Sequence, residues 1–392
     1  MNNETRRFIL ENTNADIHQL ALQSARFPQV DMPFAIRQIN GKQKIKGKIP
    51  LFYNNEAILY PAQLSLEQSS SESTAKYKAS LCEGNTLTDL TGGFGIDCCF
   101  MAEKFGQVTY IERQAELCSL AEHNFGVLGL KNIEVVHADS GKKLSEMDKV
   151  DWIYLDPARR SSGGKKVILL SDCEPDVSAL SVQLLEKANQ VMIKLSPMID
   201  IRAVQNELPN TAEVHILSVD NECKEVLVIL GQTPPENIRI KTINLTRTNE
   251  NQAFEYLMHE ESDAEVSYTS EIKSFLYEPN ASIMKSGGFK TIGTAFGLSK
   301  LHTNTHLYTS TELKLQFPGR AFEVSRLWGS SKKEWKELAI SVPKANITTR
   351  NFPLSVDELR KKLKIKEGGE VYLFACTLTN EQKVIVECRK VH

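Results

Sequence analysis

A glycine-rich turn at residues 87–97 has the residue types best suited to binding a ligand. In this segment, LTDLTGGFGID, a short apolar stretch ends in Asp89, and Gly92, Gly93 and Gly95 follow it. Because glycine has no Cβ, such a turn can bend sharply and let the backbone approach a ligand closely. A glycine turn directly after a strand is typical of several nucleotide-binding folds, and by itself it does not distinguish them.

Three further carboxylates end apolar segments in the same way as Asp89. Glu112 lies 17 residues after Gly95, where a carboxylate can accept hydrogen bonds from both hydroxyls of a ribose. Asp139 ends the next apolar segment, where an adenine amino group would be bound, and Asp156 ends the one after. Since open α/β sheets bind ligands at the carboxyl ends of their strands, these residues predict a nucleoside site with its reaction centre at Asp156.

The elements that would position these residues alternate between strand and helix from about residue 86. This alternation predicts a mainly parallel, doubly wound sheet of the Rossmann-like kind. The expected strands are 86–90, 108–112, 133–139, 151–157 and 191–197, and the expected helices are 96–105, 115–130, 181–189 and 201–208. Residues 212–230 have the pattern of two strands around a polar turn, which predicts an antiparallel edge.

These residues resemble the motifs of the class I S-adenosylmethionine-dependent methyltransferases. The resemblance rests on the turn DLTGGFGID, on Glu112 and Asp139, and on Asp156 followed by Pro157. It implies a seven-stranded sheet with a reversed final strand and S-adenosyl-L-methionine as the cofactor. The turn differs from the commonest family form at Thr91, where a glycine is usual. By this resemblance the cofactor would be bound by Asp89, Thr91, Gly92, Gly93, Gly95, Asp97, Glu112 and Asp139.

A dinucleotide-dependent oxidoreductase is the other interpretation of the glycine turn. Its phosphate-binding fingerprint GxGxxG requires a third glycine directly after Asp97, and Cys98 stands at that position. An S-adenosylmethionine site needs no phosphate-binding loop. The incomplete fingerprint therefore favours the methyltransferase interpretation.

A polar segment at residues 66–81 lies just before the first expected strand. In a related group of nucleic-acid methyltransferases a similar segment closes over the methionine end of the cofactor. The resemblance implies that Gln68, Ser73 and Thr74 supply hydrogen-bond donors to the cofactor carboxylate, from side chains or from a helix start. The alternative is that the serine and threonine residues only cap a helix.

The tetrapeptide DPAR at residues 156–159 occupies the position of the family's fourth motif. Family members that methylate exocyclic amines usually have Asn/Asp-Pro-Pro-aromatic there, so that the first side chain holds the amine and the ring stacks on a flipped base. Asp156 and Pro157 match and are the expected catalytic residues. Arg159 replaces the ring, and its guanidinium could stack on a base or bind a phosphate. No cysteine follows in the pattern that covalent C5 methylation of pyrimidines needs.

Cations gather beside this reaction centre. Arg159, Arg160, Lys165 and Lys166 lie in the loop after the fourth strand. A phosphate-bearing substrate would explain this placement, and a solvated mobile loop is the alternative. Lys194 lies within the expected strand 191–197, where a central strand should be apolar. It could pair with a carboxylate such as Asp156 or extend to the substrate, and we include it among the expected substrate-binding residues.

The last third of the chain resembles the ferredoxin-like and THUMP-like modules attached to class I methyltransferases in a bacterial family. The similar segments are 278–289, the expected strand 317–324, and 345–375, which includes a helix capped by Ser355. Because THUMP modules bind RNA, the resemblance implies tRNA or rRNA as a partner, although here the module follows the catalytic domain. The basic residues that suit a phosphate backbone are Lys344, Arg350, Arg360, Lys361, Lys362, Lys364 and Lys366. We expect Lys361 and Lys362 to contact RNA; a solvated charged face is the alternative.

The charge distribution agrees with this organisation into regions. We expect a helical N-terminal region at 1–65, a methyltransferase domain at 66–235, a ferredoxin-like domain at 236–321 and a THUMP-like domain at 322–392. Counting Lys and Arg against Asp and Glu gives 8 − 5 = +3, 16 − 25 = −9, 9 − 10 = −1 and 14 − 9 = +5 for these regions, which sum to the net charge of −2. An acidic centre between two basic ends favours a polyanionic partner.

Composition limits the class of protein. A chain of 392 residues with 41% hydrophobic residues is globular and long enough for two or three domains. It has no apolar run of about 18 residues, so no membrane span is expected. Its eight cysteines form no CxxC pair, which predicts reduced thiols in a cytoplasmic protein. His302 and His306, in the extended-looking segment HTNTH, lack a third ligand, so no metal site is expected.

The most specific prediction is therefore an S-adenosylmethionine-dependent methyltransferase that modifies a base nitrogen of structured RNA. Two alternatives stay open. One is a methyltransferase acting on a protein or a small molecule. The other is a cofactor-binding RNA chaperone or assembly factor without catalytic activity, which the departures from the usual motif in DPAR allow.

Overall fold

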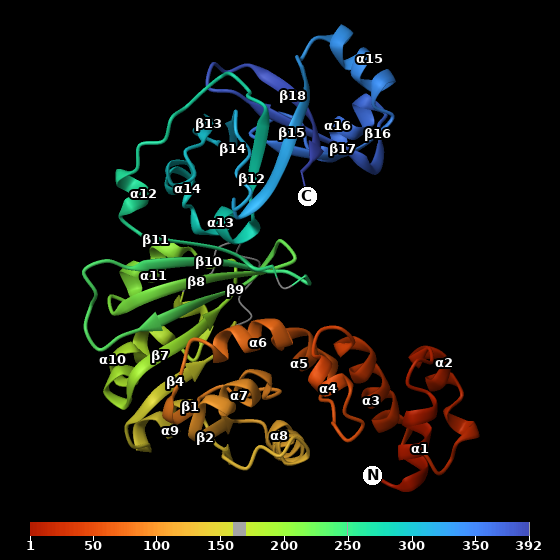
Figure 1. The fold of residues 1–392 in the computed structure, drawn as a ribbon. Helices are drawn as coiled ribbons and strands as arrows, with labels where there is room; N and C mark the ends of the chain where they lie inside the picture. Colours follow the sequence, from red (N-terminus) through yellow and green to blue (C-terminus); the bar gives the residue numbers. More distant parts are fainter. Residues whose placement is uncertain (160–169, 249, 392) are drawn as a thin grey trace. The chain divides into compact units, whose positions relative to one another are not determined.

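A nine-stranded sheet carries the predicted motifs in the computed structural model, which describes residues 1–159, 170–248 and 250–391 (Figure 1). Its strand order is β11-β10-β8-β9-β7-β4-β1-β2-β3. The bounds are β1 Gly84–Asp89, β2 Phe105–Glu112, β3 Ile133–His137, β4 Val150–Leu155, β7 Ala188–Leu195, β8 Thr211–Val219, β9 Glu222–Leu230, β10 Arg239–Leu245 and β11 Gln252–Leu257.

The strand pairing confirms the doubly wound sheet. Strands β3, β2, β1, β4 and β7 pair in parallel. β8 and β9 form a hairpin through Asp220 and Asn221, whose φ angles of 48° and 66° are those of a two-residue hairpin turn. The expected antiparallel pair is thus present, but it is not the edge of the sheet. Beyond it, β10 pairs in parallel with β8 and β11 pairs antiparallel with β10, so two strands from the predicted domain 236–321 extend the seven-stranded sheet.

The helices of this fold lie on both faces of the sheet (Figure 1). They are α6 Glu72–Ala79, α7 Ile96–Met101, α8 Ala115–Val127, α9 Ser140–Glu146, α10 Val177–Lys187 and α11 Ile201–Glu207. The chain runs from β1 to β3 through α7 and α8, and then through α9, α10 and α11 to β8 on the other side of β1. With the right-handed crossovers that are the rule for parallel strands, these two sets of helices belong on opposite faces. Helix α10 begins four residues before the predicted 181–189 because Asp176 caps it, accepting from the N–H of Ala179.

The chain divides into two compact units. One comprises Met1–Ala212 and Leu227–Pro235, and the other comprises Glu213–Val226 and Glu236–His392. The division runs through the β8–β9 hairpin, so the tip of this hairpin belongs to the second unit.

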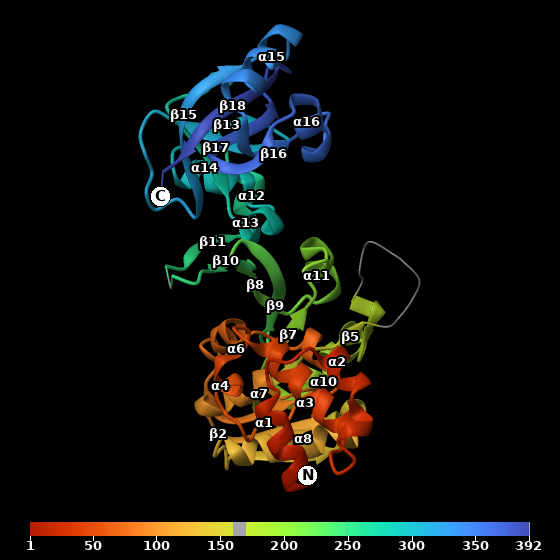
Figure 2. The ribbon, with the colours of Figure 1, turned by 90° about the vertical axis from the view of Figure 1, so that its right-hand side faces the viewer.

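Short helices form the N-terminal region of the first unit, as predicted (Figures 1 and 2). They are α1 Asn3–Glu11, α2 Ile17–Leu22, α3 Met32–Ile45, α4 Pro50–Tyr53 and α5 Gln63–Gln68. The amide of Asn124, buried in α8, both donates to the carbonyl of Leu59 and accepts from its N–H, each at 2.9 Å. Phe94 of the glycine turn packs against Phe52 and Tyr60, so this region also supports the turn.

A seven-stranded sheet of order β13-β14-β12-β15-β18-β17-β16 forms most of the second unit. Its strands are β12 Phe275–Pro279, β13 Ser299–His302, β14 Thr305–Ser310, β15 Gly319–Trp328, β16 Lys344–Arg350, β17 Lys366–Thr377 and β18 Lys383–Lys390. Its helices are α12 Glu260–Asp263, α13 Ala281–Ser286, α14 Phe289–Ala295, α15 Lys332–Ser341 and α16 Val356–Leu363. The predicted cap of α16 is confirmed as a capping box of Ser355 with Glu358.

Candidate active site

The parallel strands bring the predicted carboxylates to one edge of the sheet. Asp89 is the last residue of β1, Glu112 is the last residue of β2, and Asp156 directly follows β4. Asp139 comes two residues after β3 and caps α9, where its Oδ1 accepts from the N–H of Lys142 at 3.0 Å. The four residues therefore lie at the carboxyl ends of neighbouring strands, where open α/β sheets bind ligands.

The glycines of the turn are required by their surroundings. A Cβ at Gly92 would lie 2.2 Å from the buried ring of Tyr110, and a Cβ at Gly95 would lie 2.8 Å from the ring of Phe125. Gly93 and Gly95 have φ angles of +56° and +81°, which side chains disfavour. The hydroxyl of Tyr110 donates to the carbonyl of Gly93 at 2.6 Å. The backbone of the turn is thus held close against the sheet edge.

Backbone N–H groups hold two of the carboxylates in fixed directions. Glu112 accepts from the N–H of Gly93 at 3.0 Å and from the N–H of Gln114 at 2.8 Å, one on each oxygen. Asp89 accepts from the N–H of Thr91 at 3.0 Å. Because each carboxylate oxygen has two lone pairs, Glu112 can still accept hydrogen bonds from ligand hydroxyls.

The electrostatic environment of Asp89 is strongly acidic. Burial raises the pKa of its carboxyl well above the usual range, the N–H of Thr91 opposes the shift, and the carboxylates of Asp97, Asp156 and Glu112 raise the pKa further. A ligand with positive charge would relieve this concentration of carboxylates, whereas a pyrophosphate would add to it.

Thr91 connects the glycine turn to the DPAR motif. Its Oγ1 accepts a hydrogen bond from the N–H of Asp156 at 2.6 Å. The residue that departs from the commonest family motif therefore fixes the backbone at the predicted reaction centre.

Asp97 contacts a set of buried polar groups. Its Oδ2 accepts from the hydroxyls of Ser70 and Tyr154, each at 2.7 Å. The Nζ of Lys78 lies 3.2 Å from its Oδ1 and the Nζ of Lys194 lies 3.9 Å from its Oδ2. Burial alone would raise the pKa of Asp97, but the two ammonium groups and the two hydroxyls lower it below the usual value. The predicted role of Asp97 in cofactor binding stays a prediction.

Lys194 pairs with Asp156, one of the two partners that the sequence suggested for it. Its Nζ donates to Oδ2 of Asp156 at 2.6 Å. The side chain of Lys194 is 11% exposed and that of Asp156 is 37% exposed. Asp156 is therefore accessible at the sheet edge, while the lysine behind it is largely covered.

The polar segment before β1 forms the end of α5 and the whole of α6. Ser71 is the N-cap of α6 and accepts from the N–H of Thr74 at 3.2 Å, so capping is an observed role of this segment. Thr74 is buried and its hydroxyl donates to the carbonyl of Ser71. Gln68 ends α5. Contact of Gln68 and Thr74 with a cofactor stays a prediction, and the contact of Ser70 with Asp97 was not predicted.

The chain after Asp156 begins a two-stranded ribbon. Ala158–Arg159 (β5) pairs antiparallel with Cys173–Glu174 (β6), with Arg159 opposite Cys173. Three of the predicted substrate-binding residues, Arg160, Lys165 and Lys166, lie outside the described residues.

Several basic side chains of the second unit are held by neighbours. Arg320 and Arg350 both pair with the buried carboxylate of Glu278. The Nζ of Lys362 lies 4.7 Å from the centre of the Trp335 ring, and Lys361 is exposed on the same helix, α16. RNA binding by Lys361 and Lys362 stays a prediction.

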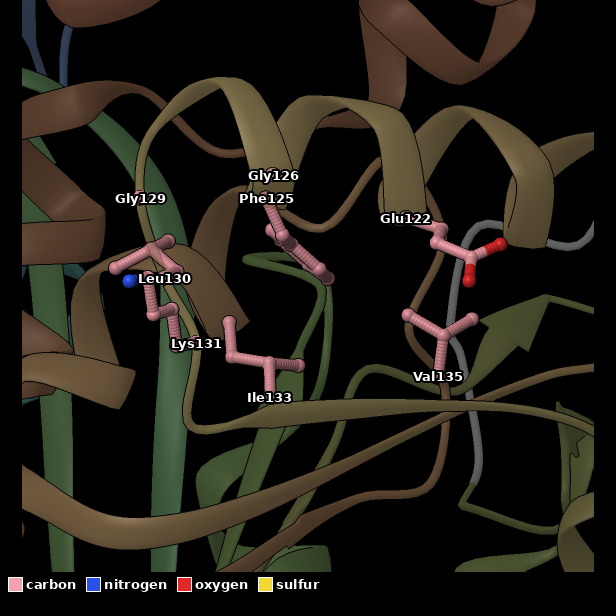
Figure 3. A pocket seen from close by; sticks show the side chains of 8 residues that line it. All are labelled: Glu122, Phe125, Gly126, Gly129, Leu130, Lys131, Ile133 and Val135. Carbon is pink, nitrogen blue, oxygen red and sulfur yellow. The ribbon is translucent and has the colours of Figure 1, made fainter.

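A cavity of about 290 Å³ lies between α8 and β3 (Figure 3). Its apolar lining includes Phe125, Leu130, Ile133 and Val135, with Glu122 at one end. None of the predicted site residues that the structure describes lines it, although the ring of Phe125 also lies against Gly95 of the glycine turn.

Among the residues described, no group of three or more His, Cys, Asp and Glu side chains could hold a metal ion. Over the same part of the chain, no helix is long and apolar enough to cross a membrane.

Comparison with known proteins gives two family matches in the C-terminal part of the chain and one similar structure over nearly its whole length. A ferredoxin-like domain model matches residues 275–318, and a THUMP domain-like model matches residues 319–390. The crystal structure of a candidate methyltransferase from Porphyromonas gingivalis W83 is similar over 99% of this chain and 98% of that one, with 35% sequence identity and a TM-score of 0.90.

Curated relatives match over a shorter length. The 23S rRNA (uracil(747)-C(5))-methyltransferase RlmC of Shewanella baltica is 31% identical over 117 residues, which are 26% of this chain and 29% of that one. The enzyme of the same name from Shewanella putrefaciens is 30% identical over 119 residues. This chain thus spans about 29% of the length of the curated relatives that it matches.

Proposed function

Because the chain belongs to the class I methyltransferases with C-terminal ferredoxin-like and THUMP-like domains, we propose that it transfers the methyl group of S-adenosylmethionine to a base nitrogen of structured RNA. The observation that carries the proposal is the position of Asp156. This residue directly follows β4 at the edge shared with the glycine turn. Thr91 accepts from its backbone N–H, Lys194 donates to its carboxylate, and the carboxylate remains accessible.

The chemistry of the sheet edge suits this cofactor. Asp89, Asp97 and Glu112 form an acidic environment, which fits a ligand carrying a sulfonium and an ammonium group and disfavours the pyrophosphate of a dinucleotide. Within the described part of the chain, the buried Oδ1 of Asp97 has no hydrogen-bond donor, although Lys78 lies nearby. Asp89, Glu112, Asp139 and the glycine turn would hold the cofactor, which supplies an electrophilic methyl group.

The role of Asp156 follows from its geometry. One oxygen accepts from Lys194, which leaves the other to accept a hydrogen bond from the N–H of an exocyclic amine. This hydrogen bond directs the amine lone pair along the line of attack on the methyl carbon. As the nitrogen–carbon bond forms, the carbon–sulfur bond breaks with its electron pair going to sulfur, and the amine then loses its proton to Asp156 or to water.

The burial of the cysteines favours a nitrogen as the atom that accepts the methyl group. The curated relatives are instead named for methylation of C5 of a uracil. Covalent C5 chemistry needs an accessible thiolate. Seven of the eight cysteines are buried, Cys173 beside the DPAR motif among them, and Cys223 is partly buried. All eight are free thiols, which agrees with the proposal that the protein acts in the reducing cytoplasm.

RNA as the substrate is supported by the THUMP-like match and by the rRNA substrate for which the curated relatives are named. The basic C-terminal region, +5 by sequence, would bind its phosphates.

The cofactor part of the proposal is tested by calorimetry with S-adenosylhomocysteine. We expect the parent protein to bind, and Asp89→Ala and Glu112→Ala to lose most of the affinity because they remove ribose-side and edge contacts. Asp148→Ala, an exposed carboxylate in the same unit, is the matched control and should bind as the parent does. The absence of binding by the folded parent would contradict the proposal.

The acceptor part is tested by mass spectrometry of nucleosides from RNA that the protein has methylated. An N-methyl nucleoside is expected. A 5-methylpyrimidine product, or methyl groups found only in protein or small molecules, would contradict the nitrogen or the RNA assignment respectively.

A further inference from the structure

Two lysines and two carboxylates form a continuous chain from α6 to Asp156. Lys78 on α6 lies 3.2 Å from Asp97 on α7, Asp97 lies 3.9 Å from Lys194 on β7, and Lys194 donates to Asp156 at 2.6 Å. Signs alternate along this chain, which we call the ion chain. It joins four separate elements behind the predicted reaction centre.

The inner members of the ion chain are held firmly. Lys78 is fully buried, and its Nζ also donates to the hydroxyl of Ser70 at 3.2 Å. Ser70 and Tyr154 both donate to Asp97. Buried ions are tolerated where they are paired and hydrogen-bonded, and here the two positive and two negative charges balance. Asp97 therefore has little freedom to move.

Lys194 is restrained from both sides. It lies between Asp97 and Asp156, and turning it toward solvent would leave both carboxylates without their shared cation. Its side chain is only 11% exposed, so it is poorly placed to reach a substrate. The hydroxyl of Thr91 fixes the backbone of Asp156, so only the side chain of Asp156 can still change its direction. Lys194 restricts that direction because it donates to one of the carboxylate oxygens.

From this geometry we infer that the ion chain sets the direction of the Asp156 carboxylate, and that Lys78, Asp97 and Lys194 are positioning residues for methyl transfer. The inference rests on the proposed function. It gives Lys194 a role different from direct substrate binding, and it assigns roles to Lys78 and Asp97 that act through Lys194.

Kinetics with tritiated S-adenosylmethionine and RNA separate positioning from binding. Lys194→Met should lower kcat at least tenfold and leave KM for RNA within about twofold of the parent, because the interaction is needed at the transition state. Lys194→Arg should recover part of kcat, since a guanidinium can also donate to both carboxylates. In the background of Asp156→Asn, Lys194→Met should change kcat little, as expected for residues acting as a unit.

Lys241→Met is the matched control, because Lys241 is another partly covered strand lysine paired with a carboxylate, Glu213, at 2.9 Å. It should retain the parent kcat. A rise in KM with unchanged kcat for Lys194→Met would overturn the inference and assign Lys194 to substrate binding.

Thermal unfolding of the protein without ligand tests the ion chain independently of activity. The melting temperature should fall less for the double variant Lys194→Met/Asp156→Asn than the sum of the two single shifts, because each single change already removes the ion pair between the two side chains. Additive shifts would overturn the inference. A non-additive result together with RNA that is never methylated would instead contradict the proposed function and leave the coupling of Lys194 to Asp156 standing.

Discussion

At the scale of single residues, Thr91 departs from the family motif and makes a hydrogen bond that the usual glycine could not make. A glycine at this position could not accept from the N–H of Asp156, whereas the threonine hydroxyl does so at 2.6 Å. The backbone of the DPAR motif is thus tied to the glycine turn through a side chain. This connection is a property of the particular sequence and adds to what the strands supply.

Thr91→Val tests this connection. The variant keeps the shape of the side chain but leaves the partly buried N–H of Asp156 without its acceptor, so the free energy of unfolding should fall by about 1 to 2 kcal/mol. Thr91→Ser retains the hydroxyl and is the control. Urea denaturation measures both, and equal stability of the valine variant and the parent would show that the hydrogen bond is not needed.

His306 should make the stability of the folded protein depend on pH. Burial, and to a lesser extent the nearby charges of Lys300 and Arg350, lower its pKa from 6.5 to about 4. Since the folded pKa lies below the unfolded one, the unfolded chain takes up a proton that the folded chain does not. Stability from this group is therefore fully present above pH 6.5 and is lost as the pH falls toward 4.

His306→Phe should reduce this acid sensitivity. A phenyl ring can keep the stack on Phe289, where the ring centres are 3.5 Å apart, and in the described structure the Nδ1 of His306 has no hydrogen bond to lose. Denaturation midpoints measured between pH 6.5 and 4 should fall less for the variant than for the parent. Parallel curves would contradict the assignment.

The residues that the sequence could predict were those in motifs. Asp89, Glu112 and Asp156 were placed at one edge because the ends of parallel strands meet there. Ser70, Lys78 and Tyr154 were missed because these polar residues belong to no recognisable sequence motif. Only their burial in the folded protein shows that they need polar partners. Lys194 was the one exception, since a lysine inside an apolar strand requires an ion partner.

At the scale of elements, periodicity predicted the alternating part of the fold. The strands β1 to β4 and β7 to β9 and the helices α7, α8, α10 and α11 follow the expected order. Helix α9 and the short ribbon of β5 and β6 were not predicted. β10 and β11 were not predicted as parts of the same sheet, because short strands between polar turns look alike in a sheet extension and in a small α+β module. Their place is decided by hydrogen bonds to β8, a non-local pairing with no local signal.

Glu278 connects three strands of the second unit. It lies on β12, is buried, and accepts from Arg320 of β15 and Arg350 of β16. Glu278→Gln removes the charge that both guanidinium groups share, and should lower the free energy of unfolding by about 3 kcal/mol. Glu381→Gln, an exposed carboxylate in the same unit, is the control. Chemical denaturation measures both, and an unaffected Glu278→Gln variant would show that these contacts add no stability.

At the scale of the whole molecule, the net charge of −2 conceals regions of opposite sign. The acidic region holds the carboxylate edge, and the basic C-terminal region includes α16 with Arg360, Lys361 and Lys362 in its last turn. The near-zero total therefore does not argue against a polyanionic partner.

Charge reversal on α16 tests RNA binding. Lys361→Glu/Lys362→Glu should weaken RNA binding across sequences and make the affinity less sensitive to salt, because two phosphate contacts and their counterions are lost. Lys142→Glu/Lys143→Glu on α9 is the matched control in the acidic region. Filter binding at several salt concentrations gives both quantities. Equal effects of the two double variants would contradict a specific role for α16.

The central claim is methyl transfer to RNA, and the most direct test is tritium transfer from labelled S-adenosylmethionine to bulk RNA. RNA from a strain lacking this protein should accept label from the parent protein, while RNA from the normal strain, already modified, should accept little. Asp156→Ala should transfer almost none, although it still binds S-adenosylhomocysteine. Equal labelling of the two RNA preparations, or none in either with a folded, cofactor-binding protein, would contradict the account.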